Sequence, residues 1–477
     1  MPGGVTCLAS SIFIVIAYVL VVAFVAFRAR LVREFVQFSL AGRTLGVALI
    51  FGSLCATYVG PGFSIGFAGK GFHSGLLFWV IGLAYSAQNV LVGLWVAPRL
   101  RASQGCQTLG DVMGQKYDRK CHVIAGVISV GLCAGFSAVM AKAGGEVLQS
   151  VFSGLGRMEA VTVIVSFAAL YTIFGGLRAS VITDAFHFTV FSIFLPLALI
   201  IVLAFHVKGG PAVFSGEAIS ATKTGFGSTS GMEIFGLLTA FLLGETLIPP
   251  YANRALASRT TQASRNSFVL AGIFSIGWFM VMVSLGIAAR LVVPKGTGED
   301  RILLTLFKTV MPGGGYVLLL MVLVSVVMSS LDSLLNAGAV AFAQDVVKPF
   351  VKVEDSAALS IGRVATVAIA AVAAVGATQV PGIVTGLLMC YTVWAPAVLP
   401  ALIIGLWIKK PYPLAGMLSM GAGTAAAIVF QFRSVLAEKL HVSFGFLQEV
   451  PAILAALILA VLAYVVGHWI AKLKGRL

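Results

Sequence analysis

Residues 55–72 read CATYVGPGFSIGFAGKGF, and they interrupt a stretch that is otherwise apolar enough to cross a membrane. Glycine and proline are the residues least suited to a continuous helix, and Gly60, Pro61 and Gly62 stand together here. A helix broken inside a bilayer releases backbone carbonyls, which can coordinate a cation where the irregular backbone is buried in protein. The spacing of Gly62 and Gly66 is also typical of close helix packing, so this stretch alone leaves both interpretations open.

The composition places the chain in a membrane. Of its 477 residues, 59% are hydrophobic and 10% are charged, and the mean hydropathy is +1.03. Soluble domains are about one quarter charged. The apolar run 5–27 is too long for the core of a signal peptide, so we expect it to be a retained span. The six cysteines form no C-x-x-C pair, so neither a disulfide framework nor a zinc site is expected.

Hydrophobic stretches of about 18 residues or more predict an all-α polytopic membrane protein with about thirteen transmembrane helices. The expected spans are residues 5–27, 45–68, 73–98, 122–150, 159–176, 181–207, 232–250, 268–293, 316–345, 358–378, 383–407, 412–431 and 449–471.

Basic residues predict the orientation. Lysine and arginine cluster after the first and third expected spans and at the end of the chain, so these loops are expected to be cytoplasmic. The N-terminus is then outside and the C-terminus inside, and we expect a bacterial inner membrane. The net charge of +15 indicates topology and contact with anionic lipid of the bilayer. A nucleic-acid surface is not expected, because no loop is long enough to form a basic soluble domain.

A second interruption lies in the expected span 232–250, where residues 244–254 read GETLIPPYANR. The two interrupted spans are five spans apart, and each would open a block of five. Paired interruptions at corresponding positions are typical of inverted-repeat transporters that bind their cargo where the helices break. This organisation favours a transporter over a receptor or an enzyme, and no set of nucleophile, base and orienting residue is recognisable. Residues 299–310, EDRILLTLFKTV, are amphipathic and are expected to lie across an outer vestibule.

Four segments resemble one known family. YTIFGGLRASVITDAFH, from Tyr171, resembles the YT-x-x-GG-x-x-A-x-x-x-TD signature of the sodium:solute symporter family, and VVMSSLDSLLNAGAVAFAQD, residues 326–345, resembles its second signature. RALASRTTQASR, from Arg254, and GRTLG, from Gly42, are similar to the family as well. The similarity extends from about residue 38 to 410.

The resemblance implies the leucine-transporter fold, a five-plus-five inverted repeat with one extra helix before it and two after it. Residues 1–477 would form one transmembrane transporter domain. Its parts would be an N-terminal helix (5–27), a first repeat (45–207), a second repeat (232–407) and two C-terminal helices (412–471).

The resemblance also implies an ion site. A sodium ion prefers hard oxygen ligands, and the family pattern places them on the carbonyls of Ala56, Val59 and Val326 and the side chains of Ser329 and Ser330. Adjacent serines in a span also serve as interhelical hydrogen-bonding groups, which is the alternative for this pair.

A second ion is implied less directly. In family members with two sodium ions, the second is held at positions matching Asp184, Ser329, Asp332 and Ser333. This chain departs from the pattern with a carboxylate at Asp332 and with His187 where glutamine is common. The two acids could bind a second cation or share a proton. Alternatively, Asp184 caps a helix at the cytoplasmic edge and Asp332 pairs with a basic residue. Asp345 is expected to be a solvated salt-bridge partner beside Lys348 and Lys352.

Candidate solute contacts are polar or aromatic residues near the interruptions. Lys142 would either bind a substrate carboxylate or pair with Glu146 four residues later. Glu245 would meet an ammonium or hydroxyl group, or the backbone freed by the nearby prolines. The full set comprises Tyr58, Gly60 and Phe63 by resemblance, and Gln88, Asn89, Lys142, Glu245, Tyr391 and Trp394 by position, the last two having core packing as their alternative.

Together these patterns predict sodium-coupled symport of a small organic solute by alternating access, with sodium as the co-transported ion. The alternative is a membrane sensor that uses a symporter-like domain to report a solute. Sensors of this kind usually carry appended signalling domains, and only KLKGRL follows the last expected span. The family motifs concern the ion and the scaffold, so the solute is not predicted.

Overall fold

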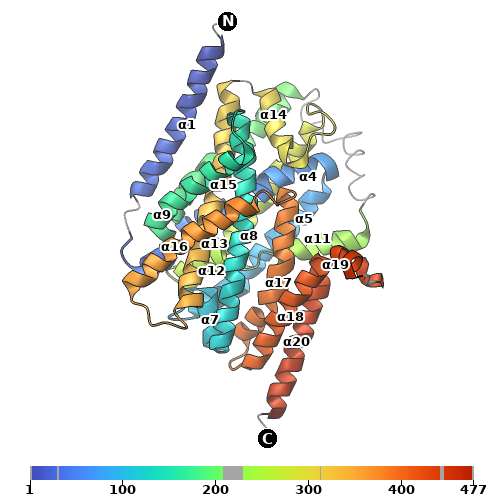
Figure 1. Cartoon of the computed structure of the whole chain (residues 1–477). Coiled ribbons are helices and arrows are strands. Elements are labelled where there is room, and N and C mark those ends of the chain that lie inside the picture. Colours follow the sequence, from blue (N-terminus) through green and yellow to red (C-terminus); the bar gives the residue numbers. More distant parts are fainter. Residues whose placement is uncertain (1–2, 29–31, 208–228, 312, 441–444, 475–477) are drawn as a thin grey trace.

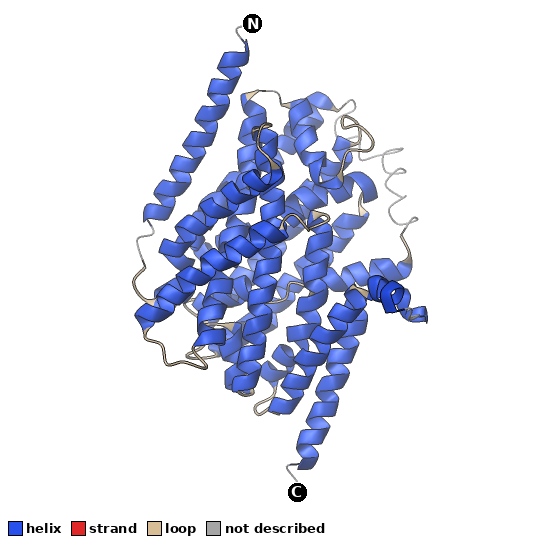
Figure 2. Cartoon of the chain, viewed as in Figure 1, coloured by secondary structure: helices blue, strands red, loops and turns tan. Residues whose placement is uncertain are grey.

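The computed structural model describes residues 3–28, 32–207, 229–311, 313–440 and 445–474. Over these residues the chain is a bundle of helices without a β-strand (Figures 1 and 2). Helices satisfy every backbone donor and acceptor internally, which a bilayer requires. The expected all-α class is confirmed.

The helices of the first half, in chain order, are α1 (Gly3–Arg28), α2 (Phe35–Leu40), η1 (Ala41–Arg43), α3 (Val47–Tyr58), η2 (Gly62–Gly66), α4 (Phe67–Ser74), α5 (Leu77–Leu91), η3 (Val92–Val96), α6 (Ala97–Ala102), α7 (Leu109–Lys116), α8 (Arg119–Val151), α9 (Arg157–Ile201) and η4 (Val202–His206). Those of the second half are α11 (Gly231–Leu243), α12 (Pro249–Ala257), α13 (Thr261–Ala289), η6 (Glu299–Arg301), α14 (Ile302–Val310), α15 (Gly314–Ala341), η7 (Phe342–Val347), α16 (Asp355–Gly376), α17 (Ile383–Trp407), α18 (Pro413–Gln431), α19 (Arg433–Leu440), η8 (Gly445–Gln448) and α20 (Ala452–Lys474).

The expected count of thirteen spans is not confirmed. Within the described ranges, nine helices are long and apolar enough to cross a membrane, or ten when the broken pair α3 and α4 counts as one span. One reason is that the expected spans 159–176 and 181–207 fall on one continuous helix, α9 with η4 (Arg157–His206). The other is that α11 and residues Phe13–Val25 of α1 are apolar but shorter than a full span.

The two parts of α9 are separated by a break at Gly176, which has a left-handed φ of +53°. A Cβ at this position would also lie 2.6 Å from Cδ2 of Phe38. Both the backbone conformation and the close approach therefore require glycine. The break directs the second part of α9, with Asp184, into the bundle.

Helix α15 forms the centre of the bundle and packs on α8 and α9 (Figure 1). In its most apolar window, 94% of the residues are buried by protein, compared with 22% for α9 with η4. Helix α1 lies at the outside beside α9, while α18 and α20 pack together at the other side. Polar residues on α15 therefore face protein and not lipid.

One short backbone pairing joins the two halves. Leu45, just before α3, forms a parallel bridge with Ser258, just after α12. The amide of Leu45 donates to the carbonyl of Ala257 (3.3 Å), and the amide of Arg259 donates to the carbonyl of Leu45 (2.9 Å). The ends of α3 and α12 that lie away from the breaks are thereby linked.

Candidate functional site

The first interrupted span is a broken helix, as the sequence predicts. Helix α3 ends at Tyr58, and the following helical segment Gly62–Ser74 is bent from it by 58°. The carbonyl of Gly60 accepts from the amides of Phe63 and Ser64 (both 3.0 Å), and the Ser64 hydroxyl donates to the carbonyl of Val59 (2.6 Å). The break is fully buried, so its carbonyls face protein atoms.

Four of the five expected sodium ligands meet at this break. The Ser329 hydroxyl on α15 donates to the carbonyls of Ala56 (2.9 Å) and Val326 (3.1 Å). The Ser330 hydroxyl lies 3.4 Å from the carbonyl of Thr57 and 3.5 Å from that of Val326. The fifth, the carbonyl of Val59, is occupied by Ser64 instead.

Gly60 allows this close approach of α3 and α15. A Cβ at Gly60 would lie 2.5 Å from the Ser330 hydroxyl oxygen. Since ordinary heavy-atom contacts are about 3.5–4.0 Å, only glycine fits without moving Ser330. Gly60 therefore both lies in the helix break and allows α3 and α15 to pack closely.

Two of the residues expected at a second ion are joined by an arginine. The Arg254 guanidinium on α12 donates from Nη2 to Asp184 Oδ2 (2.8 Å) and to the Ser333 hydroxyl (2.6 Å). Its Nε donates to the Ser53 hydroxyl (2.7 Å), which itself donates to Asp184 (2.6 Å). Both charged side chains are completely buried. Asp184 therefore does not cap a helix at an edge, because it lies within α9 and pairs with Arg254.

Asp332 lies beside this pair and is surrounded by hydroxyl groups. Tyr171 and Thr183 donate to its Oδ2 (2.8 and 3.3 Å), and Ser180 and Ser333 donate to its Oδ1 (both 3.2 Å). Among the described residues, no lysine or arginine lies within 4.0 Å of this carboxylate, so the basic partner considered from the sequence is not found.

The second interruption separates α11 from α12, and Leu247 within it has a left-handed φ of +49°. Trp394 Nε1 donates to the carbonyl of Thr246 (3.0 Å). With its amide oriented to satisfy its neighbours, Gln88 donates to the carbonyls of Phe241 (2.9 Å) and Leu242 (3.2 Å) and accepts from the Thr246 amide (2.9 Å). These two side chains replace the helical hydrogen bonds that the break removes.

Glu245 is bound by three tyrosines and not by the freed backbone. Tyr85 and Tyr251 donate to its Oε2 (2.6 and 2.7 Å), and Tyr391 donates to its Oε1 (2.7 Å). The carboxylate is 3% exposed. Tyr58 packs edge-on against Tyr251 with ring centroids 4.2 Å apart, so the Glu245 carboxylate lies among aromatic side chains.

A small cavity of about 20 Å³, lined by buried residues, lies between the two breaks. This volume holds about one water molecule, so a larger solute requires the helices to move apart. Of the expected solute contacts, Gly60, Phe63 and Glu245 line the cavity, while Tyr58, Gln88, Asn89, Lys142, Tyr391 and Trp394 do not. The other lining residues are Thr57, Gly62, Phe136, Met140, Ile248, Tyr251, Ser330, Leu334 and Leu387.

Lys142 lines a pocket separate from this cavity. Its ammonium group pairs with Glu146, as the sequence allows, and also with Asp300 in η6, the short turn before α14 (both 2.6 Å). Asp300 in turn accepts from the Ile383 amide at the start of α17 (3.2 Å). Lys142 thus connects α8 to η6 and α17.

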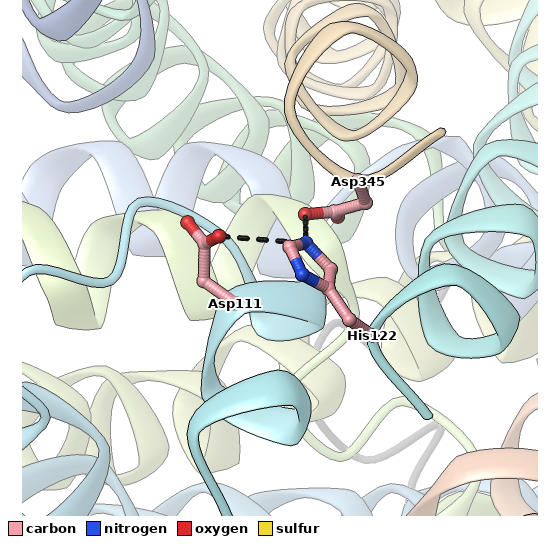
Figure 3. A group of neighbouring side chains, drawn as sticks. All are labelled: Asp111, His122 and Asp345. Atoms are coloured by element: carbon pink, nitrogen blue, oxygen red, sulfur yellow. Dashed lines mark hydrogen bonds and ion pairs between the residues drawn. The ribbon is translucent and has the colours of Figure 1, made fainter. Parts of the chain in front are cut away.

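Asp345 is not solvated, contrary to the sequence-based expectation. It is completely buried within η7 and bonds to Thr108 and His122 (Figure 3). The π-helical turn of η7 directs the carboxylate inward, away from the basic residues that follow it in the chain.

Two broken helices, with buried oxygen ligands and a small cavity between them, are the arrangement typical of membrane transporters with discontinuous helices. Comparison with known proteins makes the assignment specific. The profile of the sodium:solute symporter family matches residues 38–423. The chain belongs to the sodium:solute symporter family.

Named relatives are distant in sequence. The chain is 27% identical to the sodium/glucose cotransporter 1 of Ovis aries over 65% of this chain, and the match spans only 53% of that relative's length. It is 23% identical to the sodium/glucose cotransporter of Vibrio parahaemolyticus, covering 83% and 79% of the two chains. It is also 23% identical to the sodium/pantothenate symporter of Haemophilus influenzae, covering 91% and 90%.

Solved structures agree in fold. A Na⁺-coupled sialic acid symporter in a substrate-bound outward-open state superposes with a TM-score of 0.75 at 16% identity, covering 96% of this chain and 97% of that one. A nucleobase-cation-symport-1 family transporter in a closed conformation gives 0.59 at 13% identity, covering 91% and 94%. The chain has the leucine-transporter fold.

Proposed function

We propose that this protein is a sodium-coupled symporter that moves a small organic solute by alternating access. The observation that carries the proposal is that Ser330 lies at both places where cargo would bind. It lines the small cavity, and its hydroxyl is part of the oxygen cluster at the break after α3. An ion at the cluster and a solute in the cavity would therefore share one side chain.

Sodium would bind to the carbonyls of Ala56, Val59 and Val326 and to the hydroxyls of Ser329 and Ser330. Both hydroxyls now face carbonyl oxygens. Because hydroxyl protons rotate freely, they would turn away and present lone pairs to the ion. The ion would fix α3 against α15, and this would give the cavity the shape that the solute needs.

We propose one sodium ion for each transport cycle. The site implied for a second ion needs Asp184 and Ser333, and the Arg254 guanidinium already joins these two residues. The guanidinium therefore already supplies the positive charge that a second cation would bring to the Asp184 carboxylate. Asp332 would then stay a hydrogen-bonded neighbour of this pair and not an ion ligand.

We further propose that the solute carries a cationic amine. Glu245 is the only charged residue among those that line the cavity. Its three tyrosine partners donate hydrogen bonds but contribute no positive charge. An ammonium group beside Glu245 would neutralise the carboxylate, and the surrounding aromatic faces would attract the same cation.

The membrane sensor remains the alternative from another class, but the relatives reported above are named as transporters, which favours transport. The orientation with the N-terminus outside, the location in a bacterial inner membrane and the division into repeats 45–207 and 232–407 also stay proposals. Cysteine labelling from either side of the membrane would test the orientation.

The experiment is uptake by the full-length protein in proteoliposomes, with a panel of amines, amino acids, carboxylates and sugars. We expect at least one solute to enter faster with an inward sodium gradient than with an equal potassium gradient. Sodium and solute should each strengthen the binding of the other by the same factor, typically about 5- to 150-fold. Equal rates for every solute under both gradients would refute the symporter.

The double substitution Ser329→Ala and Ser330→Ala should abolish the sodium effect while the protein stays folded. Ser325→Ala is the matched control, because Ser325 lies one turn earlier on α15 and its hydroxyl donates to the Met321 carbonyl of the same helix. Normal sodium dependence in the double variant would show that these serines only pack the helices.

A further inference from the structure

Three acid and imidazole groups meet at one end of the bundle, away from the proposed ion site (Figure 3). Asp111 lies on α7, His122 on the first turn of α8 and Asp345 on η7. His122 Nε2 is 2.8 Å from Asp345 Oδ1 and 3.4 Å from Asp111 Oδ1. Asp345 follows Ser330 by 15 residues along one helical rod, which separates the two places by roughly 22 Å.

The two carboxylates of this cluster share one basic neighbour, although Asp111 also accepts hydrogen bonds from the Gln107 amide (2.7 Å) and from Gln344 (3.1 Å). Within the described ranges, no lysine or arginine lies within 4.0 Å of either, and His122 is their only basic partner. Asp345 is completely buried, and its Oδ2 has no hydrogen-bond partner. Buried charges are normally paired or bound to a metal. Even a protonated His122 would leave one negative charge uncompensated.

The packing keeps space for the buried carboxylate. A Cβ at Gly110 would lie 2.5 Å from Asp345 Oδ2, so the absence of a side chain there admits the unpartnered oxygen. The Thr108 hydroxyl donates to Oδ1 (2.5 Å) and fixes the orientation of the group. Hydrogen bonding by an outer residue of this kind commonly orients metal ligands.

Two of the three separations between ligand atoms are close to those of a zinc site, and all three ligand atoms lie within 4.8 Å of one another. Zinc binds histidine nitrogen and carboxylate oxygen at about 2.0–2.2 Å in tetrahedral geometry, so neighbouring ligand atoms stand about 3.3 Å apart. The separation of His122 and Asp111 already has this value, and that of His122 and Asp345 needs to open by about half an ångström. An imidazole ligand favours zinc over magnesium or calcium.

We propose that Asp111, His122 and Asp345 bind one zinc ion, with the fourth position open to water. The ion would tie α7, the start of α8 and η7 together. The binding itself does not depend on the proposed function. If the protein is an alternating-access symporter, a clamp at this end would hinder its opening, so zinc should slow uptake.

The test is zinc titration of the purified full-length protein by calorimetry and by competition with a chelating dye. We expect one zinc per chain for the wild type and a loss of affinity of about tenfold or more for His122→Gln. His73→Gln is the matched control, because His73 is exposed on α4 and belongs to no such cluster. Cobalt substitution provides a second readout, since its absorption spectrum reports tetrahedral coordination.

Asp111→Asn is the second variant, because asparagine removes the charge but keeps an oxygen that can accept the capping hydrogen bond at the start of α7. The proposal would be overturned if the wild type binds no zinc. It would also be overturned if the His122 and Asp111 variants bind zinc as tightly as the wild type does. Zinc binding that these variants lose supports the site whether or not any solute is transported. If zinc slows uptake by the wild type but not by His122→Gln, the result would show in addition that the bound ion hinders the opening of the protein.

Discussion

Replacing Gly60 by alanine tests the link between the broken helix and the ion site. The new Cβ would lie 2.5 Å from the Ser330 hydroxyl oxygen and 3.4 Å from both the Ser330 Cβ and the Thr57 carbonyl. Ser330 must therefore move by about 1 Å to reach an ordinary contact distance. Overpacking of this size destabilises a protein by about 1–3 kcal/mol.

The same displacement should weaken sodium binding. Moving one of five proposed ligands away removes an interaction comparable with a hydrogen bond to a charged group, about 1.5–3 kcal/mol. The sodium affinity should then fall by about 10- to 150-fold. The assay is the sodium dependence of thermal unfolding and of solute uptake, with potassium as the reference ion.

Two further variants make this test specific. Gly277→Ala, on the exposed side of α13 with no atom within 4 Å of the new Cβ, should behave as the wild type. Gly60→Ala combined with Ser330→Ala removes the closest atom, so stability should recover while sodium affinity stays low. Wild-type stability and sodium affinity in Gly60→Ala would refute the reasoning, because the close approach would then not exist.

Three other substitutions probe the remaining clusters. Arg254→Gln leaves the buried Asp184 carboxylate without its cation, and it should lower the free energy of unfolding by about 3–5 kcal/mol, with recovery when Asp184→Asn is added; a stable single variant in thermal unfolding would contradict this. Glu245→Gln should abolish binding of a cationic solute, measured by calorimetry, without lowering the unfolding temperature, and undiminished binding would exclude Glu245 as the counter-charge. Lys142→Met should increase amide hydrogen exchange in α14, because Asp300 loses its ammonium partner; unchanged exchange would show that this pair does not hold α14 in place.

Much of the fold was predictable because the bilayer imposes a simple rule. Long apolar runs must be helices, and glycine or proline inside two of them marks breaks. The division of α9 was less accessible. The break at Gly176 does not end the helix, and nothing in the local sequence distinguishes it from a loop between two spans.

The site was predictable where residues adjacent in sequence act together, as Ser329 and Ser330 do. The contacts of the site were not predictable where the partner residues come from spans far apart in the sequence. The family resemblance assigns no role to Arg254, although an arginine shortly after a proline break in a span is a signal of a buried charge pair. The three tyrosines around Glu245 are spread over α5, α12 and α17, and only tertiary packing brings them together.

The expectation for Asp345 failed for a related reason. Nearby lysines in sequence suggested a solvated ion pair, but the π-helical turn of η7 points the carboxylate into the protein. Charge proximity along the chain does not specify which face of a helix a residue occupies. Cysteine spacing does not indicate the proposed zinc ligands, because they are an imidazole and two carboxylates.

The bridge between Leu45 and Ser258 has a mechanical consequence. It joins the end of α3 that lies away from its break to the corresponding end of α12, whereas α4 and α11 have no such bond to each other among the described residues. The Arg254 guanidinium on α12 reinforces this link, because it donates to the Ser53 hydroxyl on α3. If an ion displaces α3, these bonds would carry α12 with it, and the breaks at Gly60 and Leu247 would act as the hinges.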